Sequence, residues 1–400
     1  MKFVLPEQVE YIISRLEKCG YRADIVGGSV RDLLLGKTPY DYDITTSATP
    51  DQTKAVFSDL RTIDTGIKHG TVSVILDGET YEITTYRVDG EYKDSRHPEE
   101  VFFTQRIEED LARRDFTVNA IAYSPSHGIT DPFGGRQDIA DKVIRAVGDP
   151  YLRFDEDALR ILRGVRFSAT LGFEIEQSTS DAIRDKRHLL TNVSAERVYV
   201  ELKKMLSGDY AYDVVYKYSD IITLIVPPLT KIVLPDRTRF EKADLYPRLL
   251  SLFALSHDDP SSAFDTACQS LRTERHIRKF GKEVLSCIGK YDMQSDISLT
   301  HALRELSVHW AITLVKLEVL LGADESAVER IVDINNNGAC YGIDQLDING
   351  NDIVSLGMTG RAVGEMLNQL LCAVIDRKCK NSRNALLAYA QRIINKTTEG

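Results

Sequence analysis

Two carboxylates, Asp41 and Asp43, follow shortly after a pair of glycines, Gly27 and Gly28. The glycines let backbone N–H groups approach an anion without side-chain obstruction, and residues 29–35 can begin a helix whose N-terminus favours negative charge. The carboxylates precede β-branched residues, so on a strand they would point to one face and bind Mg²⁺ together. Metal ions held in this way activate an attacking hydroxyl and stabilise a leaving pyrophosphate. The pattern therefore predicts a site for Mg²⁺ and a nucleoside triphosphate.

A predicted hairpin supplies a third carboxylate. Residues 70–76 and 80–87 alternate apolar and polar side chains and flank an Asp-Gly pair at 77–78, which is a strong turn signal. Glu82 lies on the second strand, on the face opposite its two apolar neighbours. If that face looks toward the two aspartates, Glu82 joins them.

A cationic segment adds groups that suit a nucleotide. Residues 113–120 read Arg-Arg-Asp-Phe-Thr-Val-Asn-Ala. Arginine forks fit phosphate oxygens, so Arg113 is a candidate phosphate ligand, and Asp115 is a candidate acceptor for a ribose hydroxyl.

Asp157 and Arg160 have the spacing of neighbours on one helix face. A carboxylate accepts from an exocyclic amine, and a guanidinium donates to a ring nitrogen or carbonyl oxygen. Cytosine and adenine both present an amine beside an acceptor, so this pair could select C and A without a nucleic-acid template. The alternative is a surface salt bridge within the helix, worth about 0.3–0.5 kcal/mol.

The elements that must position these groups change character along the chain. A helix is predicted at residues 7–18, strands and turns follow to about residue 150, and helical periodicity dominates from Phe154 onward. We expect an α+β fold, with a mixed sheet and helices first and an all-α remainder. Turn-forming residues divide the chain into segments 1–148, 149–208, 209–332 and 333–400.

The composition is that of a globular protein, with 43% apolar and 28% charged residues. No apolar segment has the length of a signal peptide, so we expect a cytoplasmic location. The six cysteines form no Cys-x-x-Cys pair, which predicts neither a zinc site nor a disulfide framework. A net charge of −10 is unfavourable for binding nucleic acid, but residues 373–400 contain six basic residues and only two acidic ones. The candidate RNA-binding residues there are Arg377, Lys378, Lys380 and Arg383.

In their order along the chain, these motifs resemble those of class II tRNA nucleotidyltransferases, the CCA-adding enzymes, within the polymerase β superfamily. The first is Gly-Gly-Ser-Val-Arg-Asp at 27–32 followed by Asp-Tyr-Asp-Ile at 41–44, a form shared with bacterial poly(A) polymerases. Residues 113–120 resemble the second motif, and residues 156–160 resemble the Glu-Asp-x-x-Arg amino-acid template. The resemblance is dense over residues 26–206.

This resemblance implies a catalytic nucleotidyltransferase head at 1–148, a nucleotide-selecting neck at 149–208, a body at 209–332 and a tRNA-binding tail at 333–400. It implies template-independent addition of C, C and A to tRNA from CTP and ATP, with Mg²⁺ in a two-metal mechanism. It also implies that Glu82 is a metal partner or the general base. The implied catalytic residues are Asp41, Asp43 and Glu82, with the first two as metal ligands, and the nucleotide-binding residues are Gly27, Gly28, Arg31, Arg113, Asp115, Asn119, Asp157, Arg160, Arg163 and Arg166.

Several alternatives remain open at this point. An enzyme that adds only A would keep every motif. One that adds only CC is disfavoured by the long, charged connection at 87–110, with Asp89, Glu91, Lys93, Asp94 and Arg96, which resembles the flexible loop that A addition needs. A poly(A) polymerase is disfavoured by the lack of a long basic C-terminal extension. A small-molecule nucleotidyltransferase leaves the helical remainder without a purpose, and the intact carboxylates argue against an inactive RNA-binding protein.

Overall fold

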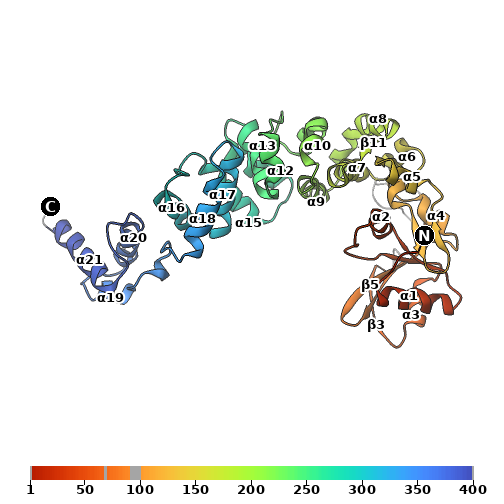
Figure 1. Ribbon diagram of the computed structural model, residues 1–400, viewed down its shortest axis with the longest axis horizontal. Helices are drawn as coiled ribbons and strands as arrows, with labels where there is room; N and C mark the ends of the chain where they lie inside the picture. Colours follow the sequence, from red (N-terminus) through yellow and green to blue (C-terminus); the bar gives the residue numbers. More distant parts are fainter. Residues whose placement is uncertain (1, 67–69, 91–100, 399–400) are drawn as a thin grey trace. The chain divides into compact units, whose positions relative to one another are not determined.

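The structure, a computed structural model, describes residues 2–66, 70–90 and 101–398. The chain divides into two compact units, Met1–Ile221 and Ile222–Gly400, which Figure 1 colours by sequence. Within the described residues, no helix is both long and apolar enough to span a membrane. All six cysteines are free thiols.

A seven-stranded mixed sheet forms the centre of the first unit. Its strands are β1 Ala23–Val26, β2 Ile44–Thr46, β3 Arg61–Gly66, β4 Thr71–Leu76, β5 Glu79–Thr85, β8 Ala122–Ser124 and β9 Gly128–Thr130. The strand order is β3-β4-β5-β2-β1-β8-β9, and β2 runs parallel to β5 while the other neighbours are antiparallel. Helices α1 (Glu7–Lys18) and α3 (Pro50–Val56) pack on the sheet and contact each other.

The hairpin and the first helix form as the sequence predicts. Asp77 and Gly78 join β4 to β5 with φ values of +53° and +84°, the conformation that a tight two-residue turn requires. Tyr81 and Ile83 are buried while Glu82 between them is exposed, which confirms the predicted face. The predicted helix at residues 7–18 coincides with α1.

The segment after the hairpin returns to the sheet through short elements. They are β6 Arg87–Asp89, β7 Val101–Phe103, α4 Ile107–Ala112 and η2 Thr117–Asn119, whereas α2 Gly28–Leu34 follows β1 and α5 Gly135–Ala140 follows β9. A Cβ at Gly135 would lie 2.1 Å from the carbonyl oxygen of Thr117, so only glycine lets α5 approach η2 this closely. Glu91, Lys93, Asp94 and Arg96 of the predicted charged loop lie outside the described residues.

Helix α7 (Leu159–Leu171) is the central element of the helical part of the first unit and packs most extensively on α9 (Ala195–Leu206). It ends at Gly172, whose φ of +70° suits a residue without a Cβ. The other elements there are α6 Pro150–Glu156, α8 Gln177–Lys186, η3 Arg187–Asn192, α10 Ala211–Lys217 and the two-stranded pair β10 Val143–Ile144 and β11 Glu174–Ile175.

The described part of the second unit is helical. Its helices are α12 Arg237–Lys242, α13 Leu245–Ser256, α14 Pro260–Ser270, α15 Arg275–Ser286, α16 Asp296–Glu305, α17 Val308–Leu320, α18 Ser326–Asn336, η4 Ile343–Gln345, α19 Gly350–Val354, α20 Arg361–Ile375 and α21 Arg383–Thr398, and α11 Ser219–Ile225 spans the boundary with the first unit. The chain's single tryptophan, Trp310, is buried on α17 and stacks on Phe280 at a ring-centroid distance of 5.7 Å. A mixed sheet followed by helices confirms the predicted α+β class.

Candidate active site

Three carboxylates gather where β2 begins beside β5. The register pairs Ile44 with Ile83, so Asp43, which directly precedes β2, and Glu82 on β5 are neighbours. Burial raises the pKa of Asp43, and the charges of Asp41 and Glu82 raise it further. Such effects require Asp41 and Glu82 each to lie within electrostatic reach of Asp43. Glu82 is therefore a neighbour of Asp43, and its part in metal binding or catalysis stays a prediction.

The prediction that Asp41 and Asp43 lie on a strand is wrong. Both precede β2, which begins at Ile44, and the carbonyl oxygen of Asp43 accepts a hydrogen bond of 3.0 Å from the backbone N–H of Val26. This bond fixes the end of a loop beside β1, and both residues keep part of their surface in solvent although the surrounding protein desolvates the Asp43 carboxylate.

These exposed carboxylates fit a divalent cation that is shared with a bound nucleotide. Within residues 2–66, 70–90 and 101–398, no group of three or more His, Cys, Asp or Glu residues is placed so that together they could hold a metal ion. Mg²⁺ sites in nucleotide enzymes use one or two carboxylates and complete the shell with phosphates and water. Asp41 and Asp43 provide that number of ligands.

Replacing Glu82 by Gln is expected to lower the pKa of Asp43, because it removes one of the negative charges that raise it. Binding of a divalent metal needs the ionised carboxylate, so the acid limb of metal binding should move to lower pH. Calorimetric titration with Mg²⁺ across acidic pH measures this shift. Glu79→Gln, an exposed change on the same strand, is the matched control, and an identical acid limb in both variants would contradict the coupling.

Arg114 lies against Gly27 and within electrostatic reach of Asp43. A Cβ on Gly27 would lie 3.1 Å from its Nη1 atom, and Gly27 has a φ of +77°. The charge of Arg114 lowers the pKa of Asp43. This residue was not among the sequence candidates, although it directly follows Arg113, which was.

The Asp110 carboxylate accepts hydrogen bonds from both Arg113 and Arg114. Its carboxylate is fully buried and accepts from Nε and Nη2 of Arg113 at 3.0 and 2.9 Å and from Nη2 of Arg114 at 3.3 Å. Burial alone would raise the pKa of Asp110, but the charges of the two arginines and their hydrogen bonds outweigh it, so the pKa is lowered. Arg113 thus donates two hydrogen bonds to Asp110, whereas Arg114 donates one and also lies near Asp43.

A chain of polar contacts links Arg31 to Arg163. Nη1 of Arg31 donates to Asn119 at 2.7 Å, the Asn119 amide donates to Asp115 at 3.3 Å, and Nε of Arg163 donates to Asp115 at 2.6 Å. Burial would raise the pKa of Asp115, but the neighbouring Arg163 lowers it overall. The structure therefore brings four of the predicted nucleotide-binding residues into one network.

The helical geometry predicted for Asp157 and Arg160 is wrong. Asp157 lies between α6 and α7 with extended backbone, and its Oδ1 accepts from the N–H of Leu159, the first residue of α7, at 3.0 Å, so it precedes the helix instead of lying on it. Its Oδ2 accepts from Arg197 at 2.8 Å, whereas Arg160 donates to Glu156 at 2.7 Å. The two residues lie near each other but have different partners.

Most of the predicted RNA-binding residues of the second unit already have a carboxylate neighbour within the protein. Arg383 donates through Nη1 to Asp352 at 3.2 Å, and Lys378 donates to Asp376 at 2.7 Å. Arg377 is exposed and lies 3.9 Å from Asp296, and Lys380 is also exposed. Arg377 and Lys380 are therefore the more accessible cations.

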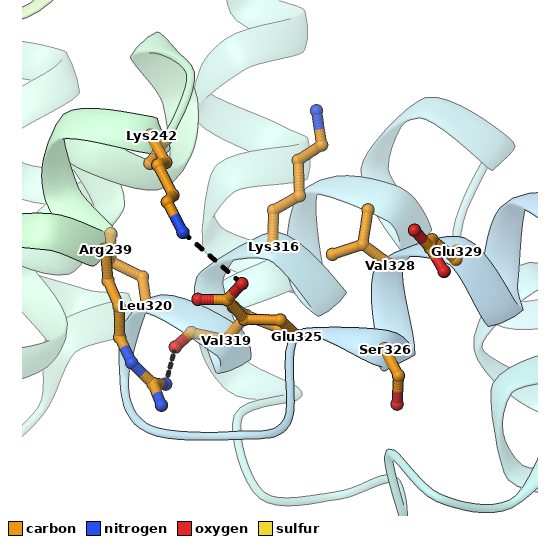
Figure 2. Close-up of a pocket in the computed structure, with 10 residues that line it drawn as sticks. Arg239, Lys242, Lys316, Val319, Leu320, Glu325, Ser326, Val328 and Glu329 are labelled. Atoms are coloured by element: carbon orange, nitrogen blue, oxygen red, sulfur yellow. Dashed lines mark hydrogen bonds and ion pairs between the residues drawn. The ribbon is translucent and has the colours of Figure 1, made fainter.

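A pocket of about 460 Å³ opens among α12, α17 and α18 (Figure 2). Lys242 lies 3.6 Å from Glu325, and Arg239 donates to the carbonyl oxygens of Val319 and Ala323. None of the predicted site residues lines this pocket.

Comparisons with known proteins agree with the geometry of the first unit. Three family models match: "Poly A polymerase head domain" over residues 23–145, "Probable RNA and SrmB- binding site of polymerase A" over 172–218, and a tRNA nucleotidyltransferase domain 2 over 248–390. The first match contains the three carboxylates and the arginine segment.

Full-length relatives are also found. The CCA-adding enzyme of Lactobacillus helveticus is 35% identical over 95% of both chains. The crystal structure of the Bacillus stearothermophilus CCA-adding enzyme in complex with CTP has a TM-score of 0.82 and 30% identity, and covers 99% of both chains. The Thermotoga maritima CCA-adding enzyme complexed with tRNA has a TM-score of 0.69 at 20% identity over 98% of this chain and 96% of its own, which shows a shared fold. Nucleotidyltransferases of this kind generally use divalent metal ions. The chain belongs to the CCA-adding enzymes, the class II tRNA nucleotidyltransferase family.

Proposed function

We propose that the protein adds C, C and A in turn to the 3′ end of tRNA, using CTP and ATP and releasing pyrophosphate. The observation that carries this proposal is the gathering of Asp41, Asp43 and Glu82 beside the start of β2, in a chain that matches CCA-adding enzymes over nearly its whole length. We also propose a cytoplasmic location, a compartment in which thiols such as the six free cysteines stay reduced.

Asp41 and Asp43 would hold Mg²⁺, since they are accessible carboxylates separated by a single residue and Mg²⁺ prefers oxygen ligands. Held by these two carboxylates, the metal would supply positive charge that favours ionisation of the terminal hydroxyl of the tRNA and stabilises the leaving pyrophosphate. Glu82 lies beside Asp43 and would accept the proton of that hydroxyl as general base.

The remaining predicted residues would bind the nucleotide. Gly27 and Gly28 leave room for phosphate oxygens, and Arg114 stands next to them. Asp115 and Asn119 would bind the ribose. The cations that would support nucleotide binding are Arg31, Arg113, Arg163 and Arg166. Of these, Arg113 would act mainly through its contacts with Asp110 and Arg160.

Asp157 and Arg160 would read the base, as parts of the proposed neck at 149–208. Asp157→Asn is expected to reduce discrimination against UTP by about 5- to 150-fold, because a wrong base edge is rejected by about 1–3 kcal/mol per good pair of contacts. The ratio of kcat/KM for CTP and UTP measures it. Asp155→Asn, a neighbouring carboxylate bonded to Lys186, is the control. Unchanged discrimination in Asp157→Asn would remove the residue from base reading.

RNA contacts would come from the proposed body at 209–332 and tail at 333–400. Arg377 and Lys380 are exposed and would meet phosphates directly. Lys378 and Arg383 would contribute after exchanging their present carboxylate partners for phosphates.

Single-nucleotide resolution of products tests the function. Purified protein and Mg²⁺ are incubated with tRNAs that end before CCA, after C and after CC, with CTP and ATP supplied separately and together. Extension of all three to a common CCA end is expected. Extension of only the CC-ended tRNA by one A would identify an A-adding enzyme, long A tails would identify a poly(A) polymerase, and no extension would return a small-molecule substrate to consideration.

A further inference from the structure

One aromatic ring in the first unit is surrounded by three arginines. Phe167 lies on α7, and its ring centroid is 3.8 Å from the guanidinium carbon of Arg166, 5.4 Å from that of Arg163 and 5.5 Å from that of Arg31. The side chain is buried, and Phe116 packs edge-on against it at 5.9 Å. Guanidinium groups at these distances are attracted to the ring by its quadrupole.

Three like charges around one ring would repel each other unless each were compensated. Arg163 is paired with Asp115 and Arg166 with Glu201, both at 2.6 Å, and Arg31 is bonded to Asp32 and Asn119. Burial and the charge of Arg163 lower the pKa of Arg166, which agrees with close approach of the two cations. Each arginine therefore has an acceptor on one side and the ring on another.

The ring joins two parts of the site that are far apart in sequence. Arg31 lies in α2, the helix that begins at Gly28, whereas Arg163 and Arg166 lie on α7. Arg163 keeps about a third of its side chain exposed, so donors that Asp115 does not use can reach a ligand. Arg31 and Arg166 are more enclosed, with about an eighth of each side chain exposed, so the ring and their acceptors surround them more closely.

We propose that Phe167 is a positioning residue for nucleotide binding, which fixes the spacing between Arg31 and Arg163 so that both act on the triphosphate of the incoming nucleotide. The proposal rests on the function proposed above and deepens it. CTP and ATP carry the same triphosphate, so loss of the ring should weaken both nucleotides by the same factor. This outcome differs from that expected for Asp157, which affects the choice of base.

The decisive comparison is Phe167→Leu against Phe167→Tyr. Leu keeps an apolar side chain but removes the quadrupole, and KM for CTP and for ATP should each rise by about 5- to 30-fold, the factor that corresponds to losing a buried cation–π contact. The kcat value and KM for tRNA should stay within about twofold of wild type, because the ring touches no reacting group. Tyr keeps the ring and should restore nucleotide KM to near the wild-type value.

Phe173→Leu is the matched control for lost packing. Phe173 is buried just beyond the end of α7, and no cation is stacked on it within the described chain. If Phe167→Leu does not fold, as judged by circular dichroism, Phe167→Met makes the same comparison with a more adaptable apolar side chain. Unchanged nucleotide KM in the ring-less variant, a rise for only one nucleotide, or an equal rise in Phe173→Leu would overturn the proposal. A wild-type protein that extends no tRNA would overturn the proposed function instead.

Discussion

Replacing Asp43 by Asn is expected to lower the rate of nucleotide incorporation by about 1,000-fold or more. The amide has nearly the same shape but carries no charge, so it binds a divalent metal poorly, and the several kcal/mol of transition-state stabilisation that such a metal supplies would be lost. Asp41→Ala should have an effect of the same order. Single-turnover incorporation of labelled CTP into tRNA measures the rate.

The fold should survive the Asp43 substitution, because removing a carboxylate whose pKa is raised by like charges relieves repulsion. Asp77→Asn is the matched control, since Asp77 lies in the hairpin turn of the same sheet and Asn tolerates its positive φ. The control should incorporate CTP at the wild-type rate. Full activity in Asp43→Asn or Asp41→Ala would rule out these residues as metal ligands.

Replacing Asp110 by Ala is expected to destabilise the first unit by about 3–5 kcal/mol, because it leaves two arginines without their buried carboxylate. Arg114 would also lose its position against Gly27, so incorporation should fall with stability. Urea unfolding followed by circular dichroism measures the change in free energy.

The pH dependence of this stabilisation has a defined sign. The pKa of Asp110 is lower in the folded protein than in the unfolded chain, so its contribution is present at neutral pH and is lost as pH falls through the folded-state pKa. The wild-type protein and Asp110→Ala should therefore converge in stability at acidic pH. Glu108→Ala, an exposed change on the same helix, should leave stability within about 0.5 kcal/mol of wild type. Equal stability of both variants at neutral pH would contradict the role of Asp110.

Features with a local cause were predictable from the sequence. The Asp-Gly turn at 77–78 fixes the hairpin and thereby the exposed face of Glu82, and the apolar spacing of residues 7–18 fixes α1. The grouping of the carboxylates followed from the type and spacing of Asp41 and Asp43, even though neither lies on a strand.

Features that depend on distant partners were not predictable. The spacing of Asp157 and Arg160 is that of a helix face, but Asp157 precedes α7, where its Oδ1 accepts a hydrogen bond from the N–H of Leu159. Phe167 resembles any buried aromatic residue of an amphipathic helix until Arg31 approaches it from another element. Arg114 could not be preferred to Arg113, because only the three-dimensional fold decides which of two adjacent arginines faces the glycine pair.

The position of the single tryptophan means that intrinsic fluorescence reports on the second unit alone. Trp310 lies in the second unit, buried against Phe280, while the proposed nucleotide-binding residues all belong to the first. Intrinsic tryptophan emission therefore originates entirely outside the unit that contains the carboxylates. Any change in that emission when CTP or ATP is added would measure how far an event in the first unit reaches the second, without a label or an engineered probe.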